Sequence, residues 1–254
     1  LEQQRANGTF QGAASVRSHS LATLALCELY GMTRDKKLLI APAQKAVNHL
    51  VSAQGKDGGW GIQIKEASTT TETAWALQAL HAARLCGDLI VPDESFRSAS
   101  KFLDSTSTEG ASFGERNREK PTPEATAAGL LARIIADKCP ADDKRLAAGV
   151  EYLMKTRLPK ADQLDYSYHY NSSWVQFHRG GLDWHRWNMG QNGRKGVRDV
   201  TIESQNSGPG GTSGSWDADK TSLGTATGRI GCTALGILTL QVYYRHAGSA
   251  EPLK

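Results

Sequence analysis

The chain has 254 residues, of which 39% are hydrophobic and 22% are charged, and its formal net charge at pH 7 is +4. This composition predicts an ordered globular protein with a large core, and the scattered Lys and Arg residues argue against the basic surface that a nucleic-acid partner needs. No apolar run approaches the roughly 18 residues of a membrane span, so we expect no transmembrane segment.

The cysteines indicate no metal or redox chemistry. They lie far apart, without the CxxC spacing of a zinc ribbon or a redox pair, at Cys27, Cys86, Cys139 and Cys232. We interpret them as buried thiols. An exported bacterial protein of this size needs no disulfide. The first residues do not form a signal peptide, but a signal peptide removed earlier would leave no trace. The cytoplasm and an exported location therefore both stay open.

Aromatic residues that follow small residues recur along the chain at an interval of about fifty residues. The intervals are 50, 53, 55 and 48 residues, between the markers Phe10, Trp60, Phe113, Tyr168 and Trp216. A constant interval of this length is typical of repeat proteins, in which one unit cannot bury its own apolar face and must stack on its neighbours.

The segment before a marker carries the pattern of an amphipathic helix. Val47, Leu50 and Val51 stand at positions i, i+3 and i+4, and the same spacing returns at residues 150, 153 and 154. The same segments repeat the order small residue, two variable residues, aromatic, Leu, as in Ala46-x-x-His49-Leu50, and a degraded copy of this order stands at residues 196–200. We therefore expect each unit to contain one helix with a single apolar stripe.

The segment after a marker is more apolar and is rich in Ala, Leu and Thr. These segments cover residues 20–29, 73–85, 126–135, 172–177 and 233–242. Helices that are hydrophobic nearly all round are buried on both sides, so we expect them to be the inner member of each helix pair. We interpret the aromatic-rich residues 166–187 as the packing core of a long connection between helices, and the floor of an apolar or sugar-binding pocket is the alternative.

Glycine and proline residues predict several helix boundaries. We expect helices to end at Gly31, at Gly87 and at the Cys139-Pro140 pair, and to start at Pro92-Asp93 and Pro123-Glu124. Almost no run alternates with the period of two that a strand requires. The sequence therefore predicts an all-α fold.

The repeat resembles the Gln-Trp motif of squalene and hopene cyclases, which protein prenyltransferase β-subunits share in a weaker form. The likeness is carried by Gln54-x-x-x-Gly58-x-Trp60, by Gln4-x-x-x-Gly8-x-Phe10, and by Gln205 with the Gly-rich run to Trp216. The chain is also similar to prenyltransferase/squalene-oxidase-repeat proteins of planctomycete-type bacteria, at Trp184-x-x-Trp187-Asn188 and at residues 239–245. The resemblance implies an α/α toroid, a partial ring of about five helix pairs with inner and outer helices, forming a single domain over residues 1–254 of a longer protein.

The repeat residues have a physical role of their own. Glycine before the aromatic permits a tight backbone bend, the aromatic ring packs across the junction of two helix pairs, and the glutamine caps an open helix end. We interpret five of them as structural staples rather than site residues: Gln54, Trp60, Phe113, Gln205 and Trp216.

The starts of the inner helices would line one rim of the central cavity that the resemblance implies. Aligning these helices on their shared Thr-Ala opening makes His19, Thr73, Thr126, Asn171 and Thr233 equivalent. The cavity-lining candidates are His19, Glu72, Thr73, Trp75, Glu124, Tyr170, Asn171, Arg229 and Cys232. For the threonines, capping of the helix starts is the favoured interpretation.

The catalytic residues of the resembled enzymes are incomplete in this sequence. The Asp-x-Asp-Asp run of the cyclases does not occur, and Asp217-Ala-Asp219 is a turn-like approximation of it. The Asp, Cys and His that hold zinc in prenyltransferases would be Asp217 and Cys232 with no well-placed histidine. We expect neither a metal nor a cofactor. A pair of carboxylates for glycoside chemistry, Glu72 and Glu124, stays open.

Two hypotheses about function follow from these observations. The favoured one is a non-catalytic module whose concave face binds an apolar small molecule, a glycan or a protein. The alternative is a divergent isoprenoid cyclase or prenyltransferase-type enzyme, which rests on the resemblance because a fold alone does not fix a function.

Overall fold

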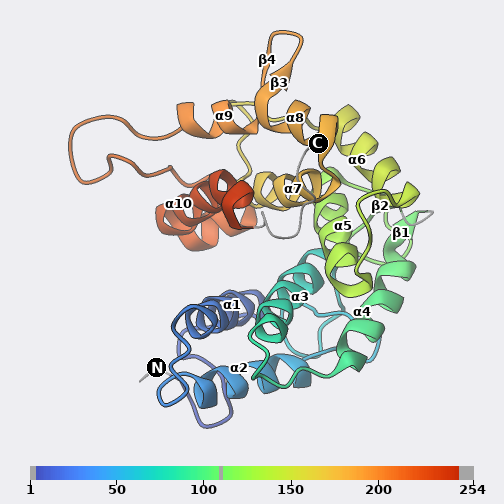
Figure 1. Ribbon diagram of the computed structural model, residues 1–254, viewed down its shortest axis with the longest axis vertical. Helices are drawn as coiled ribbons and strands as arrows, with labels where there is room; N and C mark the ends of the chain where they lie inside the picture. The colour runs from blue at the N-terminus through green and yellow to red at the C-terminus, as the bar shows by residue number, and fades with distance from the viewer. Residues whose placement is uncertain (1–3, 109–110, 246–254) are drawn as a thin grey trace. The chain divides into compact units, whose positions relative to one another are not determined.

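The computed structural model describes residues 4–108 and 111–245 and confirms the all-α prediction (Figure 1). Within these residues the strands are limited to two short antiparallel hairpins. Strand β1 (Ser107–Thr108) pairs with β2 (Ser112–Phe113), and β3 (Gly190–Gln191) pairs with β4 (Arg194–Lys195). No helix in the described part of the chain is long and apolar enough to cross a membrane, as expected.

Helices make up the rest of the regular structure. In chain order they are α1 (Val16–Thr33), α2 (Ile40–Ser52), α3 (Thr70–Leu85), α4 (Asp93–Thr106), α5 (Pro123–Asp137), α6 (Lys144–Thr156), α7 (Tyr166–Arg179), α8 (Gly181–Met189), α9 (Val197–Glu203) and α10 (Ser222–Arg245). Helix α10 is kinked at Gly228, whose backbone lies at φ 60° and ψ −153°.

The chain forms two compact units. The first comprises Leu1–Ala125 and Ala132–Cys139, and the second comprises Thr126–Leu131 and Pro140–Lys254, so α5 contributes residues to both. Closure of the helix pairs into a partial ring within a single domain stays a prediction.

In the first unit, two strongly buried helices lie side by side. Helix α1 packs along α3, and α2 contacts both of them (Figure 1). Helix α3 buries eleven of its sixteen residues, whereas α2 buries four of thirteen along one stripe. The helix after the marker is therefore the more buried member of the pair, as the sequence predicts.

In the second unit, α7 and α10 are the adjacent helices. Helices α6 and α8 contact α7, and α9 contacts both α8 and α10. The interpretation of residues 166–187 as a connection is wrong, because they form α7 and α8. The Asp165 carboxylate starts α7 by accepting a bond from the backbone N–H of Tyr168, and two glycines with positive φ, Gly180 and Gly181, separate the two helices.

The predicted helix boundaries are largely confirmed. Helix α4 begins at Asp93 and α5 at Pro123, and Gly87 follows the end of α3 with φ +77°. The predicted end at Gly31 is wrong, because α1 continues to Thr33 and is closed by Arg34 in the left-handed conformation. A glycine inside a helix is tolerated at a cost of roughly 1 kcal/mol, so it does not by itself end one.

The Gln and Gly residues of the repeat bind the next amphipathic helix in the same way twice. Gln54 Nε2 donates to the carbonyls of Gly58 (2.7 Å) and of Ser95 (2.8 Å), the third residue of α4. Gln4 Nε2 donates to the Gly8 carbonyl (3.3 Å) and, at 2.9 Å, to the carbonyl of the third residue of α2, Pro42. One amide group thus joins a turn to the first turn of the following helix.

Both glycines of these junctions need to lack a side chain. Gly8 and Gly58 have φ values of +89° and +93°. A Cβ atom on either glycine would lie 2.1 Å from a carbonyl oxygen, that of Lys45 in α2 or that of Ser98 in α4. These carbonyls belong to the sixth residue of each helix, so the two copies share one packing geometry.

The two tryptophan markers connect one helix to the next. The indole N–H of Trp60 donates to the Leu50 carbonyl of α2 (2.8 Å), and its backbone N–H donates to the Thr73 hydroxyl of α3 (3.0 Å). Trp216 makes the equivalent bonds to the Thr201 carbonyl of α9 (2.7 Å) and the Thr233 hydroxyl of α10 (3.1 Å). Each marker therefore connects the helix before it to the helix after it, at Thr73 near the start of α3 and at Thr233 just after the kink in α10.

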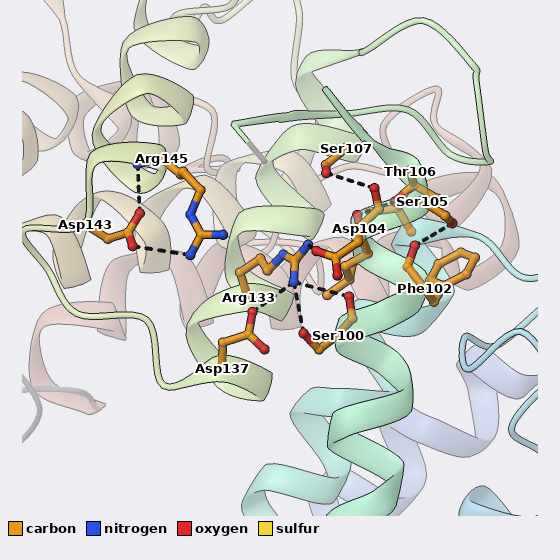
Figure 2. Close-up of polar contacts among 12 residues, drawn as sticks. Ser100, Phe102, Asp104, Ser105, Thr106, Ser107, Arg133, Asp137, Asp143 and Arg145 are labelled. Carbon is orange, nitrogen blue, oxygen red and sulfur yellow. Dashed lines mark hydrogen bonds and ion pairs between the residues drawn. The ribbon is translucent and has the colours of Figure 1, made fainter. Parts of the chain in front are cut away.

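A buried arginine attaches α5 to α4 in the first unit. Figure 2 shows the Arg133 guanidinium bonded to Ser100 of α4, at 3.0 Å to its hydroxyl and 3.2 Å to its carbonyl, and paired with Asp104. The same group also pairs with Asp137 of its own helix at 2.9 Å. Because the Arg133 side chain is only 8% exposed, these partners satisfy a charge that would otherwise be costly to bury.

Candidate ligand-binding site

The predicted cavity-lining residues divide between the two units. His19, Glu72, Thr73, Trp75 and Glu124 belong to the first unit, and Tyr170, Asn171, Arg229 and Cys232 belong to the second. Those in α1, α3, α5 and α7 stand in the first two turns of their helices, whereas Arg229 and Cys232 follow the kink in α10. Each set is described within its own unit.

In the first unit, the polar residues at the start of α3 make contacts within the protein. The Thr73 hydroxyl accepts the Trp60 backbone bond, and the fully buried ring of Trp75 packs in the core. Glu72, 1% exposed, forms an ion pair with Arg17 of α1. Burial raises the pKa of Glu72, Arg17 opposes this rise, and the nearby Glu115 adds to it.

The contacts of Glu72 and Glu124 do not support the hypothesis of a carboxylate pair for glycoside chemistry. Glu72 is engaged with Arg17, and Glu124 stands in the first turn of α5, where a negative charge stabilises the helix start. Within the described residues, no three side chains of His, Cys, Asp or Glu are grouped to hold a metal.

In the second unit, the predicted residues are mostly buried. The rings of Tyr170 and Trp174 lie 6.2 Å apart, and burial raises the pKa of the Cys232 thiol. The buried Asn171 has a side-chain oxygen with no hydrogen-bond partner in the described part of the chain. Arg229 binds the Ser215 hydroxyl at 3.1 Å and pairs with Asp217 of the same loop.

His19 is the predicted residue that lines a pocket. The pocket has a volume of about 130 Å³ and lies between the N-terminal turn of the chain, α1 and α2. Its aromatic walls are His19, His49 and Phe10, with the His19 ring 4.6 Å from His49 and 5.2 Å from Phe10 between ring centres. Leu50 and Ile64 add apolar surface, so the pocket combines an apolar lining with two imidazoles.

The hydrogen bonding of His19 fixes what its ring offers to the pocket. The Nε2 atom lies 3.1 Å from the Ala46 carbonyl, which can only accept, so Nε2 carries the proton. Burial lowers the pKa of His19, the bond to Ala46 opposes this, and His49 adds to it, so the ring is neutral at pH 7. The Nδ1 atom then carries a lone pair, and it is buried without a partner among the described residues.

A hydrogen-bond donor that reaches Nδ1 of His19 would satisfy this acceptor. Burial of an acceptor without a partner costs about 1 to 3 kcal/mol, which a ligand hydroxyl or amine at Nδ1 would recover. His49, which is half-buried and whose pKa is also lowered by burial, borders the same space.

The sequence indicated His19 but not its two neighbours. His49 and Phe10 appear there only as parts of the repeat pattern. They stand at its aromatic positions, before Leu50 and at the first marker, and this shared aromatic character in one unit was the available signal.

Comparison with known proteins supports a terpenoid cyclase-like relationship. No family model matches the chain. The chain is 30% identical over 128 residues to the squalene hopane cyclase afumA of Aspergillus fumigatus (strain CBS 144.89 / FGSC A1163 / CEA10), a match that covers 45% of this chain and 17% of that protein. The chain is thus similar to part of a squalene hopane cyclase, and it spans less than a fifth of that protein. Membership of the planctomycete-type family stays a prediction.

Proposed function

We propose that this cyclase-like repeat domain is a non-catalytic binding module, and that the pocket at His19 receives a small apolar group bearing a hydrogen-bond donor. The buried, unpartnered Nδ1 atom of His19 carries the proposal. In this proposal the pocket lies on the concave face of a partial ring of helix pairs, as the sequence predicts.

The size of the pocket limits its ligand. A dry apolar cavity of about 150 Å³ binds benzene, so about 130 Å³ suits one ring or a short branched chain. A squalene-sized molecule would place only its end group there. Small phenols and alcohols, or the end of a larger apolar molecule, have the required chemistry.

Contacts of the neighbouring polar groups favour binding over catalysis. The Thr73 hydroxyl accepts the Trp60 backbone bond, and the carboxylate of Glu72 is held by Arg17. Groups that already hold two helices together are poor candidates for moving protons to a substrate, because any displacement would also break a structural contact.

Phenol and toluene test the pocket because they have the same shape and differ in the donor. We expect phenol to bind about fivefold more tightly than toluene, as one net hydrogen bond of about 1 kcal/mol implies. Nitrogen NMR of the His19 ring, recorded during the titration, should show a change at Nδ1. Equal affinities, or no binding of either compound at millimolar concentration, would refute the proposed site.

A matched pair of variants separates the pocket from the rest of the unit. His19→Phe keeps an aromatic ring and removes the Nδ1 acceptor together with the donor for the Ala46 carbonyl, so it should abolish the preference for phenol. His81→Phe makes the same change in α3, outside the pocket lining, and should keep that preference. If both variants bind like the unaltered protein, His19 is not the ligand contact.

The second candidate function is a divergent isoprenoid cyclase or prenyltransferase-type enzyme, and the name of the Aspergillus fumigatus relative favours it. Incubation with squalene and with polyprenyl diphosphates, followed by mass spectrometry of the extract, distinguishes the two. A new product that depends on the protein would overturn the non-catalytic proposal.

A further inference from the structure

The second unit contains a larger cleft that the sequence did not indicate. It has a volume of about 690 Å³, within the range of ordinary small-molecule sites. It lies between α6, the segment after α6, α8 and the β3–β4 hairpin, and we name it the α6–hairpin cleft. All of its lining residues belong to the second unit.

One side of the cleft is apolar. Val150 and Met154 come from one face of α6, and Leu158 and Pro159 follow it. Val150 and Pro159 are buried, which fixes the position of this wall. The apolar wall would receive the hydrocarbon part of a ligand.

The opposite side is formed by a hairpin whose shape is set by its glycines. The turn residues Asn192 and Gly193 both have positive φ, 54° and 76°, as a tight two-residue hairpin turn requires. A Cβ on Gly190 would lie 2.0 Å from the Arg194 carbonyl, and one on Gly196 would lie 2.3 Å from the Asn188 carbonyl. These close approaches hold the hairpin against the end of α8.

Cations exceed anions in the lining of this cleft. Arg179 is engaged with Asp183 at 3.3 Å and with the Ala141 carbonyl at 2.9 Å. Lys195 pairs with Glu203 at 2.6 Å, and the lining residue Glu151 pairs with Lys155 at 2.6 Å.

Two arginines of the cleft lining have no partner among the residues that the structure describes. Arg186 of α8 and Arg194 of β4 have no side-chain ion pair or hydrogen bond to any residue that the structure describes. A guanidinium presents a planar fork of donors that matches a carboxylate or a phosphate. The two arginines therefore form the part of the cleft that would bind an anion, while α6 forms its apolar wall.

We propose that the α6–hairpin cleft binds an organic anion, with its apolar body against α6 and its carboxylate or phosphate on Arg186 and Arg194. This site is separate from the pocket at His19, so loss of either one leaves the other intact. An acidic peptide would use the arginines but not the apolar wall, which is why a compact amphipathic anion fits the cleft better.

Three rigid naphthalene compounds test the two halves of the proposal. Titrations followed by calorimetry would use 2-naphthoate, 2-naphthyl phosphate and the neutral 2-naphthamide, with inorganic phosphate as the anion without an apolar body. We expect at least one of the two naphthyl anions to bind about tenfold or more tightly than the amide and than inorganic phosphate, and the tighter anion identifies the head group. Equal binding of the amide, or binding of hexaglutamate in place of the naphthyl anions, would overturn the proposal.

Variants assign the anion contact. Arg186→Gln and Arg194→Gln should each weaken binding of the tighter naphthyl anion about tenfold and leave the amide unaffected. Arg198→Gln is the matched control, since Arg198 lies on α9 in the same unit, outside the cleft lining, and pairs with Asp199. A loss of equal size in the control would show that the anion responds to general charge, which contradicts a site at this cleft. Circular dichroism of each variant confirms that the helices are kept.

Discussion

Protonation of His169 is expected to destabilise the second unit in mild acid. This residue of α7 is 1% exposed, and its ring packs near Tyr168 (5.9 Å) and Trp187 (6.5 Å). Burial lowers its pKa from the ordinary value of 6.5 to about 4, the positive charge of Arg157 contributes to this shift, and the negative charge of Asp219 opposes it.

The direction of the effect follows from the two pKa values. Because the pKa of His169 is lower in the folded chain than in the unfolded chain, a proton binds preferentially to the unfolded chain. The stability is therefore complete above about pH 6.5 and falls as the pH is lowered toward 4. At about 1.4 kcal/mol per pKa unit, the loss is about 2 kcal/mol at pH 5 and about 3 kcal/mol at pH 4.

Urea unfolding of the unaltered protein and of His169→Phe, each at pH 7.5 and pH 5, measures this loss. Phenylalanine keeps an aromatic ring and removes the titration. Burial also lowers the pKa of His19, His49 and His81, so both proteins lose stability in acid, but the unaltered protein should lose about 2 kcal/mol more. The same loss in both proteins would refute the assignment to His169.

Three substitutions, with Gly12→Ala as a control, test the helix junctions by thermal unfolding. Gly58→Ala should cost at least about 3 kcal/mol of stability, because its Cβ would meet a carbonyl oxygen at 2.1 Å. Gly12→Ala, with φ +85° and open space around it, should cost about 1 kcal/mol. Similar costs for the two variants would contradict the packing argument. Trp60→Phe should cost about 1 to 3 kcal/mol through loss of the buried indole bond to α2, and no change would show that the bond is dispensable. Arg133→Met should cost only about 1 to 2 kcal/mol, because its carboxylate partners are 66% and 28% exposed and regain water; a loss above 4 kcal/mol would contradict this reasoning.

The sequence predicts the regular part of this fold because each repeat uses the same local chemistry. A glycine two residues before an aromatic marks a turn with positive φ, and Gly8, Gly58 and Gly214 all adopt it, at +89°, +93° and +79°. Apolar spacing then separates the helix with one buried stripe from the helix buried nearly all round. Both signals are local, so they can be interpreted without knowing which helices become neighbours.

The fourth sequence repeat, around Tyr168, departs from the pattern, and the sequence predicts less of its structure correctly. Tyr168, taken as a marker before a helix, lies inside the first turn of α7, because the carboxylate of Asp165 caps that helix. The β3–β4 hairpin was missed, although Asn192-Gly193 is a strong signal for a two-residue turn. The short strands around it do not alternate in hydrophobicity, so their sequence does not indicate a hairpin.

The candidate sites depend on contacts that no local pattern contains. Alignment of the helix starts selected His19, but only the packing of α1 on α2 brings His49 beside it. In the same way, Arg186 and Arg194 belong to a helix and a hairpin that meet at one cleft. Spacing in the sequence could predict which helices exist, but not which of their side chains would be left without a partner.

Comparison of the junctions shows what the repeat residues determine. At Gln205 and Gly214 the glutamine still donates to the glycine carbonyl, at 2.8 Å, and the glycine keeps its positive φ, but a Cβ there would meet no atom of the described chain within 4 Å. The glutamine bond and the positive φ therefore also occur in a longer loop on which no helix packs, where the glutamine and glycine are separated by nine positions instead of four. It follows that these two features do not depend on a packed helix, whereas the close approach of Gly8 and Gly58 to α2 and α4 belongs to the shorter turn that these two junctions share.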